Sequence, residues 1–325
     1  MFRKSDIGAW GIIIVSVIIL GWMNYQRRAA GGTFPQRPVT LICPFSPGGG
    51  TDLLARKLAH EAEKQLDVPV LVSNITGGGG AIGHAAARIA PADGYTVLVT
   101  TFELISLPVQ GLAPFTHNDF DLLMLLNMDP AAVAMRADFP AETLAEFITK
   151  AKSGDTPSIG NSGAGAVWHL AAAMLADRTN IPVTHVPFNG AAQAITALIG
   201  GHIDAVTVSP AELKTYVESK QVKLLGVMSA ERLKSFPNTP TCREQGYDLV
   251  FGTWRGLALP KGVPKETRNI LKKIFSSVAA SPEFETFAAQ SGMNLHMLSS
   301  EDFRTMTTRQ AGEVALTMKK LGLVK

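Results

Sequence analysis

Two glycine-rich stretches decide how this chain folds. The first reads Pro44-Phe45-Ser46-Pro47-Gly48-Gly49-Gly50-Thr51-Asp52, and the second reads Ser73-Asn74-Ile75-Thr76-Gly77-Gly78-Gly79-Gly80-Ala81. Each follows a short apolar run, at residues 39–45 and 68–75, and leads into an alanine-rich helical pattern, at residues 53–66 and 82–90. This order predicts two strand–loop–helix units of a parallel sheet, with both loops at one edge. Backbone N–H groups at the starts of such helices form a ready site for an anion.

The alternation of strands and helices continues along the chain. A third strand is predicted at residues 95–101, and residues 120–127 and 131–136 are expected to pair as strands around a turn at Asp129-Pro130. Short strands and helices then cover residues 158–228, including a third glycine loop, Asn161-Ser162-Gly163-Ala164-Gly165-Ala166. A strand at 249–259 and helices at 265–280, 282–291 and 300–321 follow. The pattern predicts two α/β lobes whose loops share one cleft.

The composition is typical of a protein with two domains and argues against a nucleic-acid partner. The chain has 325 residues, of which 46% are hydrophobic, so two domains can each bury a core. The formal net charge is +3, and residues 1–33 carry this whole excess. The remaining chain is therefore close to neutral, and no run of like charges marks a nucleic-acid surface.

The two cysteines give no sign of a metal site. Cys43 and Cys242 lack CxxC spacing and a neighbouring histidine cluster. Cys43 lies in the first predicted strand, where we expect a small buried side chain. The sequence leaves a disulfide between the two cysteines open.

The N-terminus predicts export from the cytoplasm. Met1-Phe2-Arg3-Lys4 is basic, residues 7–23 are apolar, and Arg27 and Arg28 follow directly. The apolar run is long for a signal peptide and slightly short for a spanning helix. Both a cleaved signal peptide, with Ala29-Ala30-Gly31 as the cleavage site, and a retained anchor fit this pattern.

The sequence carries no signature of a common enzyme class. It contains neither GxSxG nor HExxH, and the first glycine stretch lacks the Gly-Lys-Ser/Thr ending of a P-loop. The sharpest rival is a dinucleotide-binding enzyme, because residues 78–83 formally fit GxGxxG and Glu103 lies twenty positions after Gly83. Four consecutive glycines fit that pattern easily by chance. We therefore expect no catalytic residue, no cofactor and no metal.

Several polar residues beside the loops allow two interpretations. Asp52 either caps the following helix or orients a ligand. The Ser162 loop is either an ordinary tight turn or a set of donors. His169 either reaches the mouth of that loop or is structural, His185 is expected to be structural, and Asn189 either caps a helix or binds.

A series of motifs, in order along nearly the whole chain, resembles one family. From about Phe34 onward the series comprises Pro35-Gln36-Arg37-Pro38-Val39, both glycine stretches, Pro91-Ala92-Asp93-Gly94-Tyr95-Thr96, Ser162-Gly163-Ala164-Gly165, Val186-Pro187-Phe188-Asn189-Gly190-Ala191, Leu198-Ile199-Gly200-Gly201-His202-Ile203-Asp204-Ala205 and Trp254-Arg255-Gly256. The sequence is similar to the substrate-binding proteins of tripartite tricarboxylate transporters, the Bug-type extracytoplasmic solute receptors. The resemblance implies a two-lobed α/β fold of the periplasmic-binding-protein type II (Venus flytrap) class. Lobe 1 would comprise residues 34–133 and 253–325, lobe 2 residues 134–252, and residues 1–33 the signal peptide or membrane anchor.

The resemblance also implies a ligand site built by both lobes. In this family, two N-terminal glycine loops hold a carboxylate through backbone amides and ordered waters. Carried over to this sequence, the expected ligand-binding residues are Phe45, Ser46, Pro47, Gly48, Gly49, Asp52, Gly77, Gly78, Gly79, Gly80, Ala81 and Thr101 from lobe 1, and Ser162, Gly163, Gly165, His169, Phe188, Asn189 and Ser209 from lobe 2.

Three positions depart from the usual pattern of the family. Ser46 stands where a second proline is common, Ala166 where a serine is common, and Thr100-Thr101-Phe102-Glu103 where small polar residues follow the third strand. If Glu103 faces the cleft, it repels a dicarboxylate or selects a ligand with an amine or a hydroxyl. If it faces outward, it carries no information about the ligand.

The resemblance implies a solute receptor rather than an enzyme. Such a receptor works in the periplasm as a monomer, closes over a small carboxylate, and delivers it to the membrane permease subunits of a tripartite transporter. A retained N-terminal segment would tether it to the inner membrane. The alternative is a receptor that senses the same ligand and passes the closed state to a signalling partner.

Overall fold

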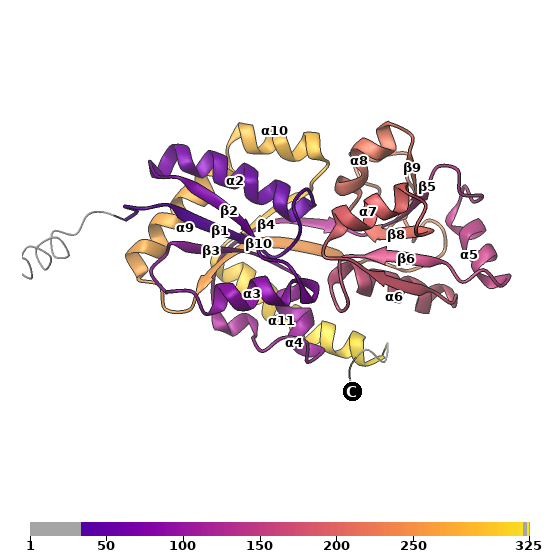
Figure 1. The fold of residues 1–325 in the computed structure, drawn as a ribbon, viewed down its shortest axis with the longest axis horizontal. Coiled ribbons are helices and arrows are strands. Elements are labelled where there is room, and N and C mark those ends of the chain that lie inside the picture. The colour runs from indigo at the N-terminus through magenta and orange to yellow at the C-terminus, as the bar shows by residue number, and fades with distance from the viewer. Residues whose placement is uncertain (1–33, 321–323, 325) are drawn as a thin grey trace, which may run out of the picture.

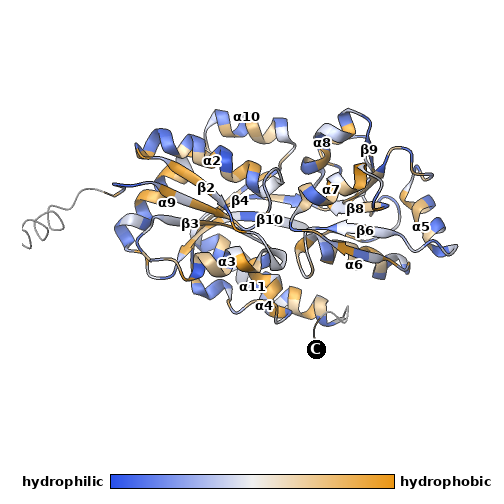
Figure 2. Ribbon diagram, in the orientation of Figure 1, coloured by the Kyte–Doolittle hydropathy of each residue, from blue (hydrophilic) through white to orange (hydrophobic). Residues whose placement is uncertain are grey.

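The computed structural model describes residues 34–320 and Val324, and it shows two α/β lobes side by side (Figure 1). Lobe 1 contains a six-stranded sheet of order β11-β4-β10-β3-β1-β2, and lobe 2 contains a five-stranded sheet of order β7-β6-β8-β5-β9. Apolar residues gather on the strands and on the inward faces of the helices, while the outer helix faces are polar (Figure 2). The predicted two-lobed α/β fold is confirmed.

Lobe 1 is a sheet covered by helices on both faces. Its strands are β1 (Val39–Cys43), β2 (Val70–Asn74), β3 (Thr96–Thr101), β4 (Phe120–Pro130), β10 (Gly252–Pro260) and β11 (Leu295–Leu298). One face carries α2 (Gly50–Leu66), α9 (Lys265–Ala279) and α10 (Pro282–Ser291); the other carries α3 (Ala81–Arg88), α4 (Glu103–Val109) and α11 (Ser300–Lys320) (Figure 1). Two 3-10 turns, η1 (Gly78–Gly80) and η2 (His117–Asp119), complete the lobe.

Lobe 2 repeats the same layers with shorter strands. Its strands are β5 (Ala132–Arg136), β6 (Ser158–Asn161), β7 (Thr184–Pro187), β8 (Ala205–Val208) and β9 (Val222–Val227). Its helices are α5 (Leu144–Lys152), α6 (Val167–Thr179), α7 (Ala191–Ile199) and α8 (Pro210–Glu218). The lobe boundaries that the resemblance implies stay a prediction, and β5 begins shortly before the expected boundary between residues 133 and 134.

The predicted pairing between residues 120–127 and 131–136 is wrong. β4 pairs with β10 and β11 in lobe 1, whereas β5 pairs with β8 and β9 in lobe 2. The chain passes from one sheet into the other at Ala131, because β4 continues to Pro130 instead of turning back. β10 runs antiparallel along the full length of β4, so these two long strands reach the junction of the lobes together (Figure 1).

The N-terminal glycine loops follow parallel strands, as predicted. β1 pairs in parallel with β2 and with β3, so the loops after β1 and β2 leave the same edge of the sheet. α2 begins at Gly50 rather than at Leu53, which places the end of the first loop inside the first helical turn. All four residues from Gly77 to Gly80 have positive φ, between 59° and 119°, a conformation that favours glycine.

Some sequence-based expectations concern residues 1–33, including the signal peptide or anchor, and these lie outside the described residues. Across residues 34–320, no helix combines the length and apolar character needed to span a bilayer.

Cys43 and Cys242 are both buried and free, so no disulfide joins them. Burial raises the pKa of each thiol to about 12.

Candidate ligand-binding cleft

The glycine loops of the two lobes touch each other across the cleft. A Cβ atom added at Gly79 in lobe 1 would lie 2.8 Å from the Ala164 carbonyl oxygen in lobe 2, and one added at Gly163 would lie 2.8 Å from Gly79 Cα. The Ser46 amide donates to the Asn189 carbonyl oxygen at 3.3 Å. The loops thus approach at a distance that only glycine permits.

Behind these contacts lies a cavity of about 20 Å³, which has room for about one water molecule. Four residues expected from the sequence line it, namely Phe45, Gly49, Thr101 and Ser162. The other lining residues are Gly50, Thr51, Glu103, Val167, Trp168, Ala191, Glu212, Thr253 and Arg255. Residues of both lobes therefore enclose one small polar space.

The other residues expected from the sequence lie around this cavity rather than in its lining. Four of them take part in the contacts between the glycine loops of the two lobes, namely Ser46, Gly79, Gly163 and Asn189. The cavity lining does not include Pro47, Gly48, Asp52, Gly77, Gly78, Gly80, Ala81, Gly165, His169, Phe188 or Ser209.

Asp52 serves the first glycine loop and does not reach the cavity. Its carboxylate accepts hydrogen bonds from the Gly48 amide at 2.9 Å, from Arg56 at 2.8 Å and from Asn74 at 2.8 Å. Burial raises the pKa of Asp52, but these hydrogen bonds outweigh burial and hold it below its usual value. Asp52 is not the N-cap, since that position belongs to Gly49.

His169 and Ser209 also stabilise the local backbone. His169 Nδ1 accepts a hydrogen bond from the Gly165 amide at 3.0 Å, and its ring packs edge-on against His185. Burial, together with His185, lowers the pKa of His169 to about 4, so its ring is neutral at pH 7. Ser209 is the N-cap of α8, and its hydroxyl accepts from the Ala211 amide.

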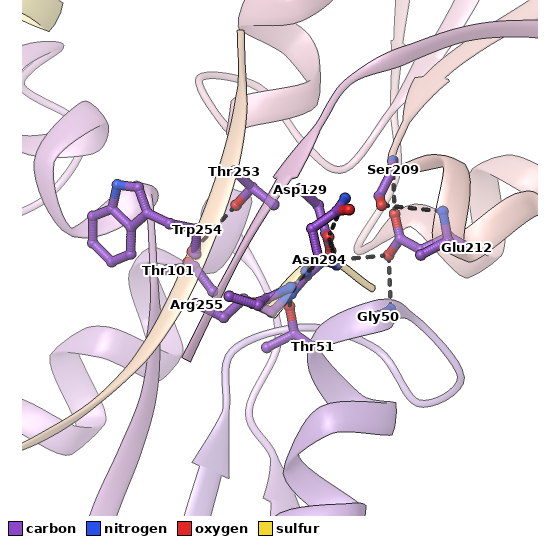
Figure 3. A network of polar contacts seen from close by, with 12 residues as sticks. Gly50, Thr51, Thr101, Asp129, Ser209, Glu212, Thr253, Trp254, Arg255 and Asn294 are labelled. Carbon is purple, nitrogen blue, oxygen red and sulfur yellow. Dashed lines mark hydrogen bonds and ion pairs between the residues drawn. The ribbon is translucent and has the colours of Figure 1, made fainter. Parts of the chain in front are cut away.

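Arg255 lies at the centre of a network of polar contacts (Figure 3), and it is buried and lines the cavity. Its Nη1 donates to Asp129 at 2.6 Å, its Nε donates to Thr51 Oγ1 at 3.0 Å, and its Nη2 lies 4.0 Å from Glu212. The guanidinium fits because Gly50 lacks a side chain, since a Cβ atom there would lie 2.7 Å from Nη2. Among the described residues that line the cavity, Arg255 is the one cation.

Two glutamates reach across the cleft in opposite directions. Glu212 of lobe 2 accepts from the Gly50 amide at the start of α2, at 2.7 Å. Glu103 of lobe 1 accepts from the Val167 amide at the start of α6, also at 2.7 Å. Each helix therefore receives its N-terminal carboxylate partner from the opposite lobe. Burial raises the pKa of both glutamates. Hydrogen bonds from Thr101 and the Val167 amide partly offset this effect at Glu103, and the charge of Arg255 followed by the Gly50 amide does so at Glu212.

Two buried hydroxyls at the cleft lack a partner. Ser46 Oγ and Ser162 Oγ are enclosed but make no hydrogen bond within residues 34–320. An unsatisfied buried hydroxyl costs about 1–3 kcal/mol, so such groups are usually bonded to protein, water or a ligand. A polar ligand or a water molecule at the cleft would supply the missing bonds.

Sequence reasoning did not select Arg255 or Glu212 as site residues. Trp254-Arg255-Gly256 is one of the motifs that carry the family resemblance. A cationic residue on the strand predicted at 249–259 was the available signal that Arg255 belongs to the cleft. Glu212 follows Ser209 at capping-box spacing, and this pattern alone indicates a local cap. Its second contact, with lobe 1, depends on how the lobes meet.

A family model of tripartite tricarboxylate transporter family receptors (TctC) matches residues 54–323. The chain belongs to this family. The family and the fold are those of solute-binding receptors rather than of enzymes.

Solved structures of similar proteins share the fold of this family receptor. The periplasmic binding protein BugD is 30% identical, with a TM-score of 0.87, over 90% of this chain and 100% of its own. MatC from Rhodopseudomonas palustris, solved with bound malate, is 27% identical, with a TM-score of 0.79, over 90% of this chain and 100% of its own. A TctC solute binding protein from Polaromonas, solved with no ligand, is 39% identical, with a TM-score of 0.65, over 89% of this chain and 100% of its own. These likenesses confirm the family resemblance and the Venus-flytrap fold.

A larger cavity of the receptor, of about 530 Å³, lies between α6, α11 and the long crossing strands. Its lining is mainly apolar, with Met174, Phe251 and Trp254 among the side chains. No residue of the three glycine loops lines it. It therefore lies away from the glycine loops, where the two lobes touch each other.

His84 supports the second glycine loop of the receptor. Its Nδ1 lies 2.9 Å from the Gly80 carbonyl oxygen, which can only accept, so Nδ1 carries the proton. Its Nε2 lies 3.3 Å from Thr100 Oγ1, and the buried ring stacks on Phe115. Burial lowers the pKa of His84 to about 4, so the ring is neutral in the folded state.

We expect His84 to make the receptor sensitive to acid. Because folding lowers its pKa from 6.5 to about 4, the contribution of His84 to stability is full above pH 6.5 and is lost as the pH falls towards 4. The loss amounts to at most about 3 kcal/mol, at about 1.4 kcal/mol per pKa unit. Urea unfolding between pH 7 and pH 4 measures it. His84→Gln should flatten the pH dependence, whereas the exposed control His60→Gln should not; equal slopes in both variants would contradict the assignment.

Proposed function

We propose that this chain is an extracytoplasmic receptor that captures a small carboxylate between its lobes and delivers it to the permease subunits of a tripartite transporter. The observation that carries the proposal is the meeting of glycine loops from both lobes at one cleft, with Gly79 against Ala164 and Ser46 bonded to Asn189. The start of α3, directly after the second glycine loop, has no side-chain cap, and such a helix N-terminus favours a negatively charged ligand. MatC, a similar protein solved with bound malate, supports a carboxylate as the ligand.

Closure of the lobes is the proposed working motion. A ligand that touches both lobes favours the closed arrangement by its differential affinity for the two states. The Polaromonas protein is more identical to this chain than BugD is, yet it superposes less well, with a TM-score of 0.65 against 0.87. A lower TM-score at higher identity supports the proposal that the two lobes are arranged differently in different members of this group of similar proteins.

A ligand screen tests the capture step. The full chain, purified in mild detergent because residues 7–23 are apolar, is melted with acetate, butyrate, succinate, malate and citrate. An acid present at 100 times its Kd should stabilise the fold by about 2.7 kcal/mol and raise the Tm by several degrees. Calorimetry should then give one site per chain. The absence of a saturable shift with every acid would contradict carboxylate capture.

Uptake assays test the delivery step and the non-enzymatic role. Vesicles containing permease subunits of the tripartite type should accumulate the radiolabelled acid only when the loaded receptor is added. The acid should be recovered chemically unchanged, and sedimentation should show a monomer. Uptake that proceeds equally well without the receptor would contradict delivery.

A further inference from the structure

The N-terminus of α6 lacks a cap from its own lobe. Ala166 occupies the N-cap position and offers no side-chain acceptor. Glu103, the first residue of α4 in lobe 1, supplies the acceptor instead, with Oε1 2.7 Å from the Val167 nitrogen. Thr101 Oγ1 donates to the other oxygen of Glu103 at 2.5 Å, so both carboxyl oxygens are engaged.

Glu103 lies in the wall of the proposed ligand site. It is fully buried and lines the same cavity as Gly49 and Arg255. Ser162 lines this cavity as well, and its hydroxyl, only 3% exposed, has no partner among the described residues. The unpartnered hydroxyl marks this space as a polar binding site independently of the helix N-terminus.

The space next to Glu103 does not admit a second anionic group. The Glu103 carboxylate already accepts from the Val167 amide at 2.7 Å, so a ligand carboxylate can reach that amide only by displacing the Glu103 side chain. The lining already contains two carboxyl side chains, Glu103 and Glu212, against the single guanidinium of Arg255. A second ligand carboxylate would therefore meet like charge as well as an occupied helix terminus.

We propose that this receptor selects monocarboxylates, with Glu103 taking the place at the α6 N-terminus that the second carboxylate of a dicarboxylate ligand would need. This inference rests on the proposed carboxylate-binding function. The single carboxylate of the ligand then belongs to lobe 1, where the second glycine loop lies, and its uncharged end faces Glu103 and Ser162. Whether Glu103 is charged or neutral, it fills the space and accepts a hydrogen bond from the Val167 amide.

Matched pairs of acids test this selectivity. Butyrate and succinate differ only by a methyl group in place of a carboxylate, and so do 3-hydroxybutyrate and malate. Calorimetry on the full chain at pH 7.5 should show tighter binding of the monocarboxylate in at least one pair, by roughly 100-fold, as expected for like charges about 4 Å apart in a partly screened site.

Variants at position 103 assign the selectivity to this side chain. Glu103→Ser should remove the competing carboxylate and lower the ratio between the two acids at least tenfold, mainly by improving the binding of the dicarboxylate. Glu103→Ala removes both the carboxylate and the acceptor for the Val167 amide, so it provides the same test if the serine variant unfolds. Glu283→Ser is the control, because Glu283 is an exposed glutamate in the first turn of α10.

The possible outcomes separate this inference from the proposed function. If the unmodified chain binds the monocarboxylate no more tightly than the dicarboxylate in both pairs, monocarboxylate selection is overturned and carboxylate capture stands. An unchanged ratio in both Glu103 variants would overturn the role of Glu103. If none of the four acids binds, carboxylate capture itself is wrong, and the selectivity falls with it.

Discussion

Replacing Arg255 by methionine is expected to lower the free energy of unfolding by about 3–5 kcal/mol, the usual effect of removing one partner of a buried ion pair. The side chains of Arg255 and Asp129 are only 2% and 1% exposed, so water cannot replace the lost cation. Asp129 would keep its bonds from Asn127 and Asn294 but would carry a buried, uncompensated charge. Urea unfolding monitored by circular dichroism measures the loss.

A matched surface variant isolates the effect of burial. Arg243 pairs with Asp248 at 2.7 Å, close to the distance between Arg255 and Asp129, but its side chain is 49% exposed. Arg243→Met should therefore cost less than about 1 kcal/mol. Comparable losses in the two variants would show that the buried network is not the reason for the effect. Arg255→Met should also weaken carboxylate binding, since it removes the cation that lines the cavity.

Replacing Gly79 by valine is expected to weaken carboxylate binding by at least roughly 100-fold, because it prevents the lobes from meeting. A Cβ atom at this position would lie 2.8 Å from the Ala164 carbonyl oxygen of the opposite lobe, and this neighbour is backbone that cannot rotate away. Calorimetry with the best-binding acid measures the loss, and a thermal melt checks that the variant is folded.

The control for Gly79 shares its backbone conformation but not its surroundings. Gly111 has φ +68°, close to the +63° of Gly79, and a Cβ atom added there would meet nothing within 4 Å. Gly111→Val therefore carries the same strain of a β-branched residue at positive φ without blocking the cleft. If the two variants bind equally well, contact between the loops is not needed for binding.

Much of the fold could be predicted because its signals are local. Strand, glycine loop and helix follow one another within about thirty residues, and α9, α10 and α11 begin at the expected residues 265, 282 and 300. The pairing of β4 could not be predicted in this way, because its partner β10 lies more than a hundred residues further along the chain. An apolar run shows that a strand is buried but not which strand it joins.

The candidate site, like the fold, could be predicted where its signals are local and could not be predicted where its contacts join distant residues. The glycine loops could be found from composition and spacing, since positive φ at all four residues from Gly77 to Gly80 favours glycine. The contacts of Glu103 with Val167 and of Glu212 with Gly50 join residues 64 and 162 positions apart. Such contacts depend on how two finished lobes fit together, and a glutamate near the start of a helix has an ordinary local role in most sequences.

The position of β10 has a consequence for the order in which the chain assembles. β10 lies between β3 and β4 in the first sheet, although its residues follow those of every strand in the second sheet. The second sheet is made from one continuous stretch, so its strands can pair as soon as β9 has emerged. The first sheet must wait for Gly252–Pro260 before its two halves can join. The lobe that is started first is therefore the lobe that is finished last, and until then the pairing edges of β3 and β4 that receive β10 stay open to other chains.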